Sequence, residues 1–430
     1  MTAGIGVLGV ATRRTFRSLQ VRNYRLFFFG QLVSVSGTWM QQIAQDWLVL
    51  RLTNRALPVG ITTALQFTPV LLLGIWGGLI ADRVDKRKLL LATQSAMAAL
   101  ALALGVLTAT GAVRLWMVYL LAALLGCATA FDMPTRQSFV TEMVGREHVA
   151  NAVGLNSAVF NSARVIGPAA AGVLIAVAGI APAFLLNAAS YLAVIISLLL
   201  MDPSRLYRQA PVERSRGQVR DGLRYVRATP LLSWTILLML VVSTFGLNYR
   251  VVLPLLARFS FHGGAGLYGM LASVQSVGAV AGALLIASRA RPTRKLLLGS
   301  VTAFGLLSLL AAAAPTVATE ALVLAPVGFA TVTVMATANS TLQLGAAPEM
   351  RGRVMSLYGL VFLGSTPFGS ALVGWLAEHY GPRSAIVLAG VSSLLAAAVA
   401  AFAARRHRDP AAANALVTPA ETETASDEAA

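Results

Sequence analysis

Apolar stretches of about 20 residues follow one another along almost the whole chain, and short polar segments separate them. A helix of about 20 residues is about 30 Å long, which is the thickness of the hydrocarbon core of a bilayer. A large soluble helical protein would need a polar face on most of these helices, and most of them have none. The pattern therefore predicts an all-α membrane protein with twelve transmembrane helices, near residues 24–50, 58–80, 88–110, 115–139, 149–177, 182–201, 231–256, 265–288, 296–314, 318–343, 353–378 and 384–404.

An internal repeat divides these helices into two sets of six. Residues 126–192 match residues 328–394 at a constant offset of 202, and no gap is needed. A period of half the chain in a membrane protein indicates two related bundles that face each other, as in alternating-access transporters. We therefore expect two pseudo-symmetric six-helix bundles. The repeated glycines are Gly126, Gly167, Gly172 and Gly179, which recur as Gly328, Gly369, Gly374 and Gly381.

The same pattern predicts five regions along the chain. Residues 1–22 form a cytoplasmic N-terminal segment, and the two bundles occupy residues 23–202 and 230–405. The connecting residues 203–229 are rich in arginine, which suits a linker at the cytoplasmic membrane surface. Residues 406–430 are rich in alanine, threonine and glutamate, and we expect a disordered cytoplasmic tail there.

The distribution of basic residues predicts the orientation of the chain in the membrane. The formal net charge of +17 could by itself indicate a nucleic-acid partner. Most of the 34 Lys and Arg residues, however, fall in segments that would be cytoplasmic if the N-terminus is cytoplasmic. This bias is the positive-inside rule, and such basic patches bind anionic lipid headgroups. We therefore expect both termini in the cytoplasm, lipids rather than nucleic acid as partners, and a location in the bacterial cytoplasmic (inner) membrane.

The segment between the second and third predicted helices carries a motif. It reads Gly78-Leu-Ile-Ala-Asp82-Arg83-Val-Asp85-Lys86-Arg87-Lys88. Gly78 permits close approach of helices, Asp82 can cap the next helix, and the basic residues can anchor the loop to the inner surface. The motif resembles the signature loop of the major facilitator superfamily. Asp85 stands where that family has glycine, and aspartate tolerates the left-handed backbone of a tight turn better than most residues.

Further segments are similar to a bacterial branch of this superfamily that includes enterobactin exporters and macrolide-efflux-like proteins. The resemblance implies two bundles that rock about a central site, driven by a proton or ion gradient. It also implies a gating role for the loop residues Gly78, Asp82, Arg83 and Arg87. The segments that carry it are Gly37–Gln42, Asp46–Leu48, Met133–Gln137, Asn151–Ser157, Arg164–Pro168 and Arg351–Ser356.

One segment of the fifth predicted helix resembles the antiporter motif of the superfamily. It reads Gly167-Pro168-x-x-x-Gly172, with Ala163 and Ala171 in place of two glycines of that motif. Such a sequence makes a close-packed helix that kinks easily, and any membrane bundle could use it. The resemblance favours export and a gating role for Gly167 and Pro168.

Carboxylates inside the membrane are rare and are functional candidates by default. Asp46 and Asp132 are the only aspartates within the predicted helices, so we take both as candidates for proton coupling. Asp46 lies near the outer mouth, where it could instead pair with Arg51 or cap backbone groups. Asp132 and Arg136 are one helical turn apart, so they could form a static ion pair. By resemblance, they belong to an inner-gate network.

Other polar residues inside the membrane predict a substrate site. The first helix carries a glutamine stripe that includes Gln41, Gln42 and Gln45, and such a stripe should face water or another helix. Arg164 lies near the bilayer centre on the same helical face as Asn161, and Arg250 follows Asn248 in the opposite bundle. Two facing arginines could bind an anionic or oxygen-rich substrate. The alternative is hydrogen bonding between helices.

The sequence offers no support for an enzyme. It contains no phosphate-binding loop of the Gly-x-x-x-x-Gly-Lys-Ser/Thr type, no metal-ligand spacing and a single cysteine, Cys127, so we expect no cofactor and no metal. We expect a monomeric secondary active transporter that exports a drug, siderophore or secondary metabolite by proton antiport. A non-transporting sensor on the same fold, or a facilitative or sodium-coupled carrier, are the alternatives.

Overall fold

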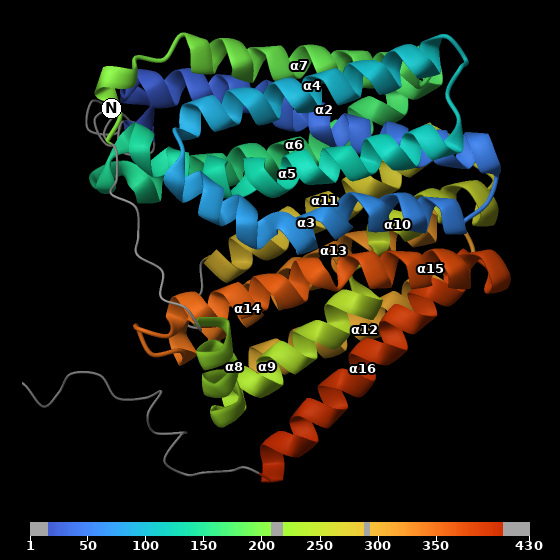
Figure 1. Cartoon of the computed structure of the whole chain (residues 1–430). Coiled ribbons are helices and arrows are strands. Elements are labelled where there is room, and N and C mark those ends of the chain that lie inside the picture. Colours follow the sequence, from blue (N-terminus) through green and yellow to red (C-terminus); the bar gives the residue numbers. More distant parts are fainter. Residues whose placement is uncertain (1–15, 208–217, 288–292, 407–430) are drawn as a thin grey trace, which may run out of the picture.

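The computed structural model describes residues 16–207, 218–287 and 293–406. Most of the predicted N-terminal segment, the middle of the predicted linker and nearly all of the predicted tail lie outside these ranges. Within them, eleven stretches of helix are long and apolar enough to cross a membrane. The glutamine-rich helix α2 is a twelfth, and its 32 residues run alongside the others (Figure 1). The prediction of an all-α protein with twelve membrane-spanning helices is confirmed.

The N-terminal bundle consists of six continuous helices. Each begins and ends within a few residues of its predicted span. They are α2 (Arg22–Thr53), α3 (Leu57–Arg83), α4 (Lys86–Ala109), α5 (Leu115–Val144), α6 (Val149–Ala178) and α7 (Ala181–Leu199).

The C-terminal bundle also has six spans, but two of them are interrupted. Its first span comprises α9 (Pro230–Val241), a π-helical segment (Val242–Gly246), α10 (Tyr249–Leu255) and a second π-helical segment (Leu256–Ser260). Its fifth span is divided into α14 (Arg351–Gly364) and α15 (Thr366–Tyr380). The other spans are α11 (Ala265–Ala287), α12 (Arg294–Ala312), α13 (Val317–Gly345) and α16 (Pro382–Arg406).

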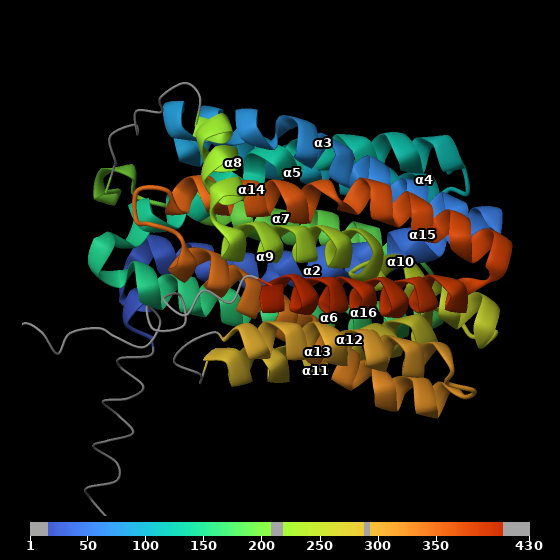
Figure 2. The same cartoon turned by 90° about the horizontal axis from the view of Figure 1, so that it is seen from below.

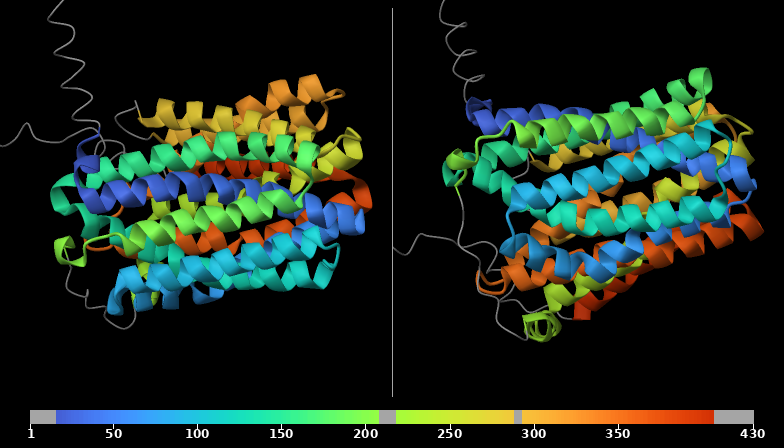
Figure 3. Two further views of the ribbon diagram at one scale, coloured as in Figure 1. Left: turned by 90° about the horizontal axis from the view of Figure 1, so that it is seen from above. Right: turned by 45° about the horizontal axis from the view of Figure 1, so that its top comes forward.

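All twelve spans run roughly lengthwise through the molecule (Figures 2 and 3). At the end where α2 begins, the short linker helix α8 (Gln218–Ala228) lies across their direction and packs on α14 (Figure 1). We call this the basic end, because the arginine-rich segments lie there. The opposite end holds the turns after α2, after Ser260 and after α15. We call it the closed end, for the contacts described below.

The repeated glycines have the same structural roles in both halves. Gly179 follows α6 with a φ of +84°, and Gly381 follows α15 with a φ of +83°. Glycine adopts this conformation without strain, so both residues end their helices in the same way. Gly126 packs on the backbone of α3 at Gln66, and Gly328 packs on the backbone of α11 at Gln275. The pseudo-symmetry predicted from the sequence is therefore present in the packing.

Candidate functional site

The two bundles meet at the closed end through two crossings of glycine-containing helices. A Cβ at Gly374 of α15 would lie 3.1 Å from the Cα of Gly60 in α3. A Cβ at Gly269 of α11 would lie 3.0 Å from the Cα of Gly172 in α6. Neither crossing has room for a larger side chain without movement of backbone. Gly172 and Gly374 are repeat equivalents, so the two contacts are related by the pseudo-symmetry.

Polar contacts join the bundles at the rim of the closed end. Arg55 donates from Nε to Oε1 of Glu378 at 2.9 Å, and Oε2 of Glu378 accepts from the backbone N–H of Leu57 at 2.8 Å. Arg258 donates to the side-chain oxygen of Asn54 at 3.1 Å. The Arg55 side chain is 65% exposed, so its ion pair contributes about 0–1 kcal/mol. These contacts orient the rim segments of the two bundles but contribute little to the free energy that keeps the bundles together.

A buried charged cluster lies below the rim, and both bundles contribute to it. Asp46 of α2 is 0% exposed, and its Oδ2 accepts a hydrogen bond from the Tyr268 hydroxyl of α11 at 2.9 Å. The same oxygen lies 3.7 Å from Nε of Arg250 in α10. Arg250 also donates to Oε1 of Gln66 in α3 at 3.0 Å and lies 5.7 Å from the ring centre of Phe67. We call Asp46, Gln66, Arg250 and Tyr268 the interbundle cluster.

The cluster leaves polar atoms unpaired among the described residues. Oδ1 of Asp46 and Nε2 of the neighbouring Gln45 are buried and have no hydrogen-bond partner there. A buried ion pair adds little net stability, but removal of one partner leaves an uncompensated charge. The cluster can therefore respond strongly to a change in its protonation. Asp46 thus pairs with Arg250 and not with Arg51.

Arg250 lies in the interrupted first span of the C-terminal bundle, and the interruption determines its position. Pro254 has no N–H to donate to the Arg250 carbonyl, and π-helical segments precede and follow α10. π-Helical turns inside helices are frequent at functional sites. The Asn248 amide donates to the Thr244 carbonyl at 2.7 Å, so this buried residue stabilises the break. Gly369 of α15 packs directly on the Thr244 carbonyl.

The predicted glutamine stripe on α2 does not face a single environment. Gln41 is buried and its Oε1 accepts from Nδ2 of Asn187 in α7 at 2.6 Å, so it bonds within its own bundle. Gln42 is half-buried. Gln45 is buried beside Asp46. The stripe therefore links the interior of the N-terminal bundle to the interbundle cluster.

One face of α6 changes its environment along the helix. Toward the closed end, Pro168 and Gly172 on this face are buried against α11. One to three turns toward the basic end, the same face carries Arg164, Asn161 and Ser157, which are half-buried or exposed. We call these three residues the open face of α6.

Arg164 on the open face has no hydrogen bond or ion pair with any residue in the part of the chain that the structure describes. Asn161 donates from Nδ2 to the Ser157 carbonyl at 2.8 Å, which leaves its side-chain oxygen available. The adjacent Phe160 contacts Trp39 of α2 edge to face, with ring centres 5.6 Å apart. A cation, an amide oxygen and an aromatic ring thus lie together about halfway along the helix.

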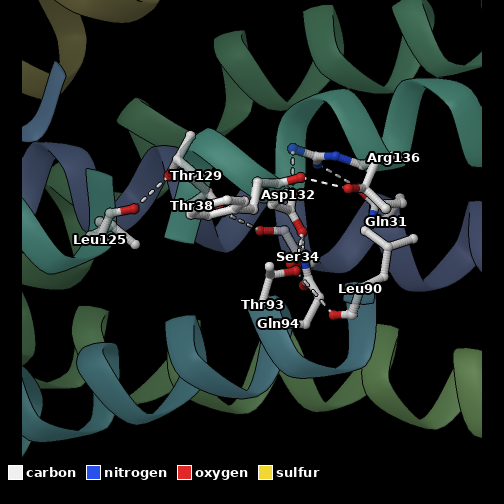
Figure 4. A network of polar contacts seen from close by, with 12 residues as sticks. Gln31, Ser34, Thr38, Leu90, Thr93, Gln94, Leu125, Thr129, Asp132 and Arg136 are labelled. Atoms are coloured by element: carbon white, nitrogen blue, oxygen red, sulfur yellow. Dashed lines mark hydrogen bonds and ion pairs between the residues drawn. The ribbon is translucent and has the colours of Figure 1, made fainter. Parts of the chain in front are cut away.

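Asp132 lies in a different environment, inside the N-terminal bundle (Figure 4). It is 1% exposed, and its Oδ1 accepts from Oγ1 of Thr93 at 2.9 Å and from Nε2 of Gln94 at 2.7 Å. Oδ2 lies 3.1 Å from Nη2 of Arg136, which donates from Nη1 to Gln31 at 2.9 Å. The predicted Asp132–Arg136 pair is present, and it connects α2, α4 and α5.

The signature loop at the basic end differs from the expected tight left-handed turn. Asp85 has φ −61° and ψ 111°, and its carboxylate caps α4 by accepting from the backbone N–H of Lys88 at 3.2 Å. Arg87 donates to the Leu198 carbonyl at the end of α7 at 2.6 Å. At the position where the family has glycine, Asp85 therefore acts as the N-cap residue of α4. An N-cap residue needs no positive φ.

The remaining loop residues predicted to act in gating lie at the same end. Asp82 is half-buried, and Arg83 is exposed. Gly77, the neighbour of Gly78, packs on the Ala130 carbonyl of α5. Gly167 packs on Trp39, so it sets the contact between α6 and α2.

Comparison with known proteins identifies the family. Residues 14–426 match the family model described as a transmembrane secretion effector. The chain belongs to this family of major facilitator superfamily transporters. It is thus a multi-pass membrane transporter and not an enzyme.

Curated relatives cover nearly the whole chain. The staphyloferrin A transporter of Staphylococcus aureus is 26% identical over 391 residues, which is 89% of this chain and 96% of the relative. The multidrug efflux pump Tap of Mycolicibacterium fortuitum is 27% identical over 391 residues, 88% of this chain and 95% of the relative. The enterobactin exporter EntS of Escherichia coli O9:H4 is 25% identical over 378 residues, 86% of this chain and 89% of the relative.

Solved structures agree in fold at lower identity. A bacterial homolog of the human lysosomal transporter Spinster gives a TM-score of 0.70 at 16% identity and covers 89% of this chain and 97% of its own. The nucleoside transporter NupG, solved as a point mutant, gives a TM-score of 0.71 at 13% identity and covers 89% and 99%. Both likenesses concern the fold alone.

Proposed function

We propose that this protein exports an amphipathic small molecule across the cytoplasmic membrane in exchange for protons, by alternating access. The observation that carries the proposal is the interbundle cluster, which places a buried carboxylate and its counterion on opposite bundles. A proton on Asp46 would neutralise one side of the contact that joins the bundles. The names of the relatives, which include exporters of siderophores and drugs, support the direction of transport.

The proposed orientation places the basic end in the cytoplasm, with both termini there. The positive-inside bias of the arginines supports it. The closed end then faces outward, and the conformation described above is inward-facing. A reporter fused to Ala430 that is active only outside the cell would overturn this orientation.

The proposed cycle couples Asp46 to the closure of the outer end. With Asp46 ionised, its attraction to Arg250 favours the closed outer end, and substrate enters from the cytoplasm. When the bundles rock to open outward, the pair separates and Asp46 takes up a proton as the substrate leaves. On return, the approach of Arg250 displaces the proton from Asp46.

The open face of α6 supports the class of substrate. Arg164 has no carboxylate partner in the described part of the chain, so an anionic or oxygen-rich substrate group would supply one. Phe160 and Trp39 would contact apolar parts of the same molecule. We therefore propose that a monomer binds an amphipathic molecule with carboxylate, phenolate or carbonyl oxygens.

The coupling role is tested by comparing Asp46→Asn with Asp132→Asn in proteoliposomes. Asp46→Asn should reduce the rate of export driven by a proton gradient more than about tenfold. It should leave the rate of substrate-for-substrate exchange unchanged. Asp132→Asn retains a side-chain oxygen that can accept the same hydrogen bonds, and all of these bonds lie within one bundle. This variant should therefore retain gradient-driven export. If the wild-type flux ignores the proton gradient, antiport is wrong and a sodium-coupled or facilitative carrier is the better account.

A further inference from the structure

The linker helix α8 has two faces of different character. The face that packs on the C-terminal bundle contains Gly222 and Val226, and Val226 is 4% exposed. The opposite face is exposed and follows the i, i+3, i+4, i+7 spacing of a single helical face. We call it the arginine stripe, and it consists of Arg220, Leu223, Arg224 and Arg227.

Hydrogen bonds to two other segments fix the orientation of α8. The Tyr225 hydroxyl accepts from the backbone N–H of Ala347, which follows α13, at 3.1 Å. The Ser233 hydroxyl of α9 donates to the Val226 carbonyl at 2.7 Å, so the corner between α8 and α9 is closed by a side chain. Because the inner face of α8 is held in this way, the arginine stripe points away from the C-terminal bundle.

The position of α8 along the spans places it at the level of the lipid headgroups. α8 ends at Ala228, two residues before the membrane span Pro230–Ser260. It also contacts Arg353, which is in the first turn of the membrane span Arg351–Tyr380. α8 lies across the direction of the spans in two perpendicular views (Figures 1 and 2). A helix that crosses the spans where two of them begin lies in the plane of the membrane surface.

The charges of the stripe have no counterions in the described part of the chain. None of its three arginines forms an ion pair there. The single acidic residue of α8, Asp221, has its Oδ2 3.6 Å from Nη1 of Arg353 in α14. An arginine near an anionic membrane surface raises affinity about fivefold, so three together give about 100-fold. Leu223 is 39% exposed between these cations, as in helices that lie at the boundary of headgroups and acyl chains.

We propose that the arginine stripe of α8 is a docking site for anionic lipids of the membrane leaflet at the basic end. The phosphate groups of these lipids bind its three arginines, and their acyl chains contact Leu223. Because α8 is bonded to α9, the bound lipids hold the beginning of the span that carries Arg250 at the membrane surface. The inference rests on the membrane location of the family and is independent of the proposed proton coupling.

The first test measures which lipids lie next to α8. A fluorophore is attached to Ala228→Cys in a Cys127→Ser background, because Ala228 is exposed and lies beside the stripe without belonging to it. The full chain is reconstituted in phosphatidylcholine bilayers that contain some phosphatidylglycerol. Bromine on the acyl chains of the phosphatidylglycerol should quench the fluorophore at least about threefold more than the same amount of brominated phosphatidylcholine. Equal quenching by the two lipids overturns the proposal. So does the absence of quenching by either, which would place the stripe in water and favour a soluble anionic partner.

The second test separates a local docking site from a general attraction of lipids to the basic end. Replacing the three arginines of the stripe by glutamine keeps the helix propensity and should abolish the preference for phosphatidylglycerol at Ala228→Cys. The matched control is the triple variant Arg17→Gln, Arg22→Gln and Arg25→Gln, which removes the same charge from exposed residues at the same end of the other bundle. This control should retain the preference. Equal loss in both triple variants would mean that net charge alone attracts the lipids, and it would overturn the proposal. Neither measurement needs a substrate, so failure of the proposed antiport would leave both results intact.

Discussion

The two halves of the fifth span of the C-terminal bundle differ sharply in their environment. α15, at the closed end, buries Pro367, Gly369, Ser370, Val373, Gly374 and Ala377. α14, at the basic end, buries only Val354 and Gly364. α3 packs mainly on α15 and only marginally on α14. Within this one span, α15 at the closed end is therefore tightly packed and α14 at the basic end is loosely packed. Alternating access requires such a difference between the two ends.

Glycines at the two ends reflect the same difference. Gly60 and Gly374 at the closed end each face backbone of the opposite bundle. Gly154 of α6 and Gly359 of α14 lie toward the basic end. A Cβ added at either residue would have no atom of another residue within 4 Å. A glycine in a helix without a close neighbour destabilises the helix by about 1 kcal/mol relative to alanine. We propose that these glycines make the equivalent crossings when the basic end closes.

The largest effect on this asymmetry is expected from loss of the buried cation. Arg250→Gln should open the closed end, because Asp46 then remains buried without its counterion, at a cost of about 3–5 kcal/mol. The measurement is labelling of the variant Val373→Cys by a membrane-impermeant thiol reagent, in a Cys127→Ser background. Labelling should be at least tenfold faster when Arg250→Gln is added.

The double variant Asp46→Asn with Arg250→Gln provides the control. It removes both charges, so the closed end should seal again while proton coupling stays lost. Labelling that stays fast in the double variant would mean that the shape of Arg250, and not its charge, holds the bundles together.

Gly374→Leu should have a smaller effect, because it adds volume without leaving a charge buried. Overpacking at a tight contact costs about 1–3 kcal/mol, so the outward-open population should rise roughly tenfold. Gly359→Leu is the matched control in the same span, where the structure has space. We expect it to leave the closed end sealed to thiol reagents and to slow export by hindering the opposite conformation. Equal labelling of both variants would contradict the assignment of separate crossings.

Much of the fold could be predicted from the sequence because burial in a bilayer imposes long apolar stretches. The repeat also pairs Gly172 with Gly374, and in the structure both residues lie at equivalent crossings between the bundles. The π-helical segments around Arg250 were not predicted, because they depend on packing against α15 and α16. A continuous helix over residues 231–256 was the natural expectation from hydropathy alone.

The partner of Asp46 was the main element of the site that the sequence left open. Sequence distance favoured Arg51, only five positions away, whereas Arg250 comes from the other bundle. The repeat offered a signal, because Asp46 and Arg250 lie in the first spans of the two halves at a separation of 204, close to the offset of 202.

The smallest effect is expected at the rim of the closed end. Arg55→Gln removes an exposed ion pair worth about 0–1 kcal/mol, so thiol labelling of Val373→Cys should change by no more than about fivefold. Glu378→Gln should have the larger effect of the two, because the Glu378 carboxylate also accepts from the N–H of Leu57 at the start of α3, where a negative charge is favoured. Both effects should weaken in high salt, whereas the effect of Arg250→Gln should persist, because a buried pair is screened much less. If Arg55→Gln instead opens the closed end as far as Arg250→Gln does, the rim and not the interbundle cluster holds the bundles together, and the proposed coupling through Asp46 loses its structural basis.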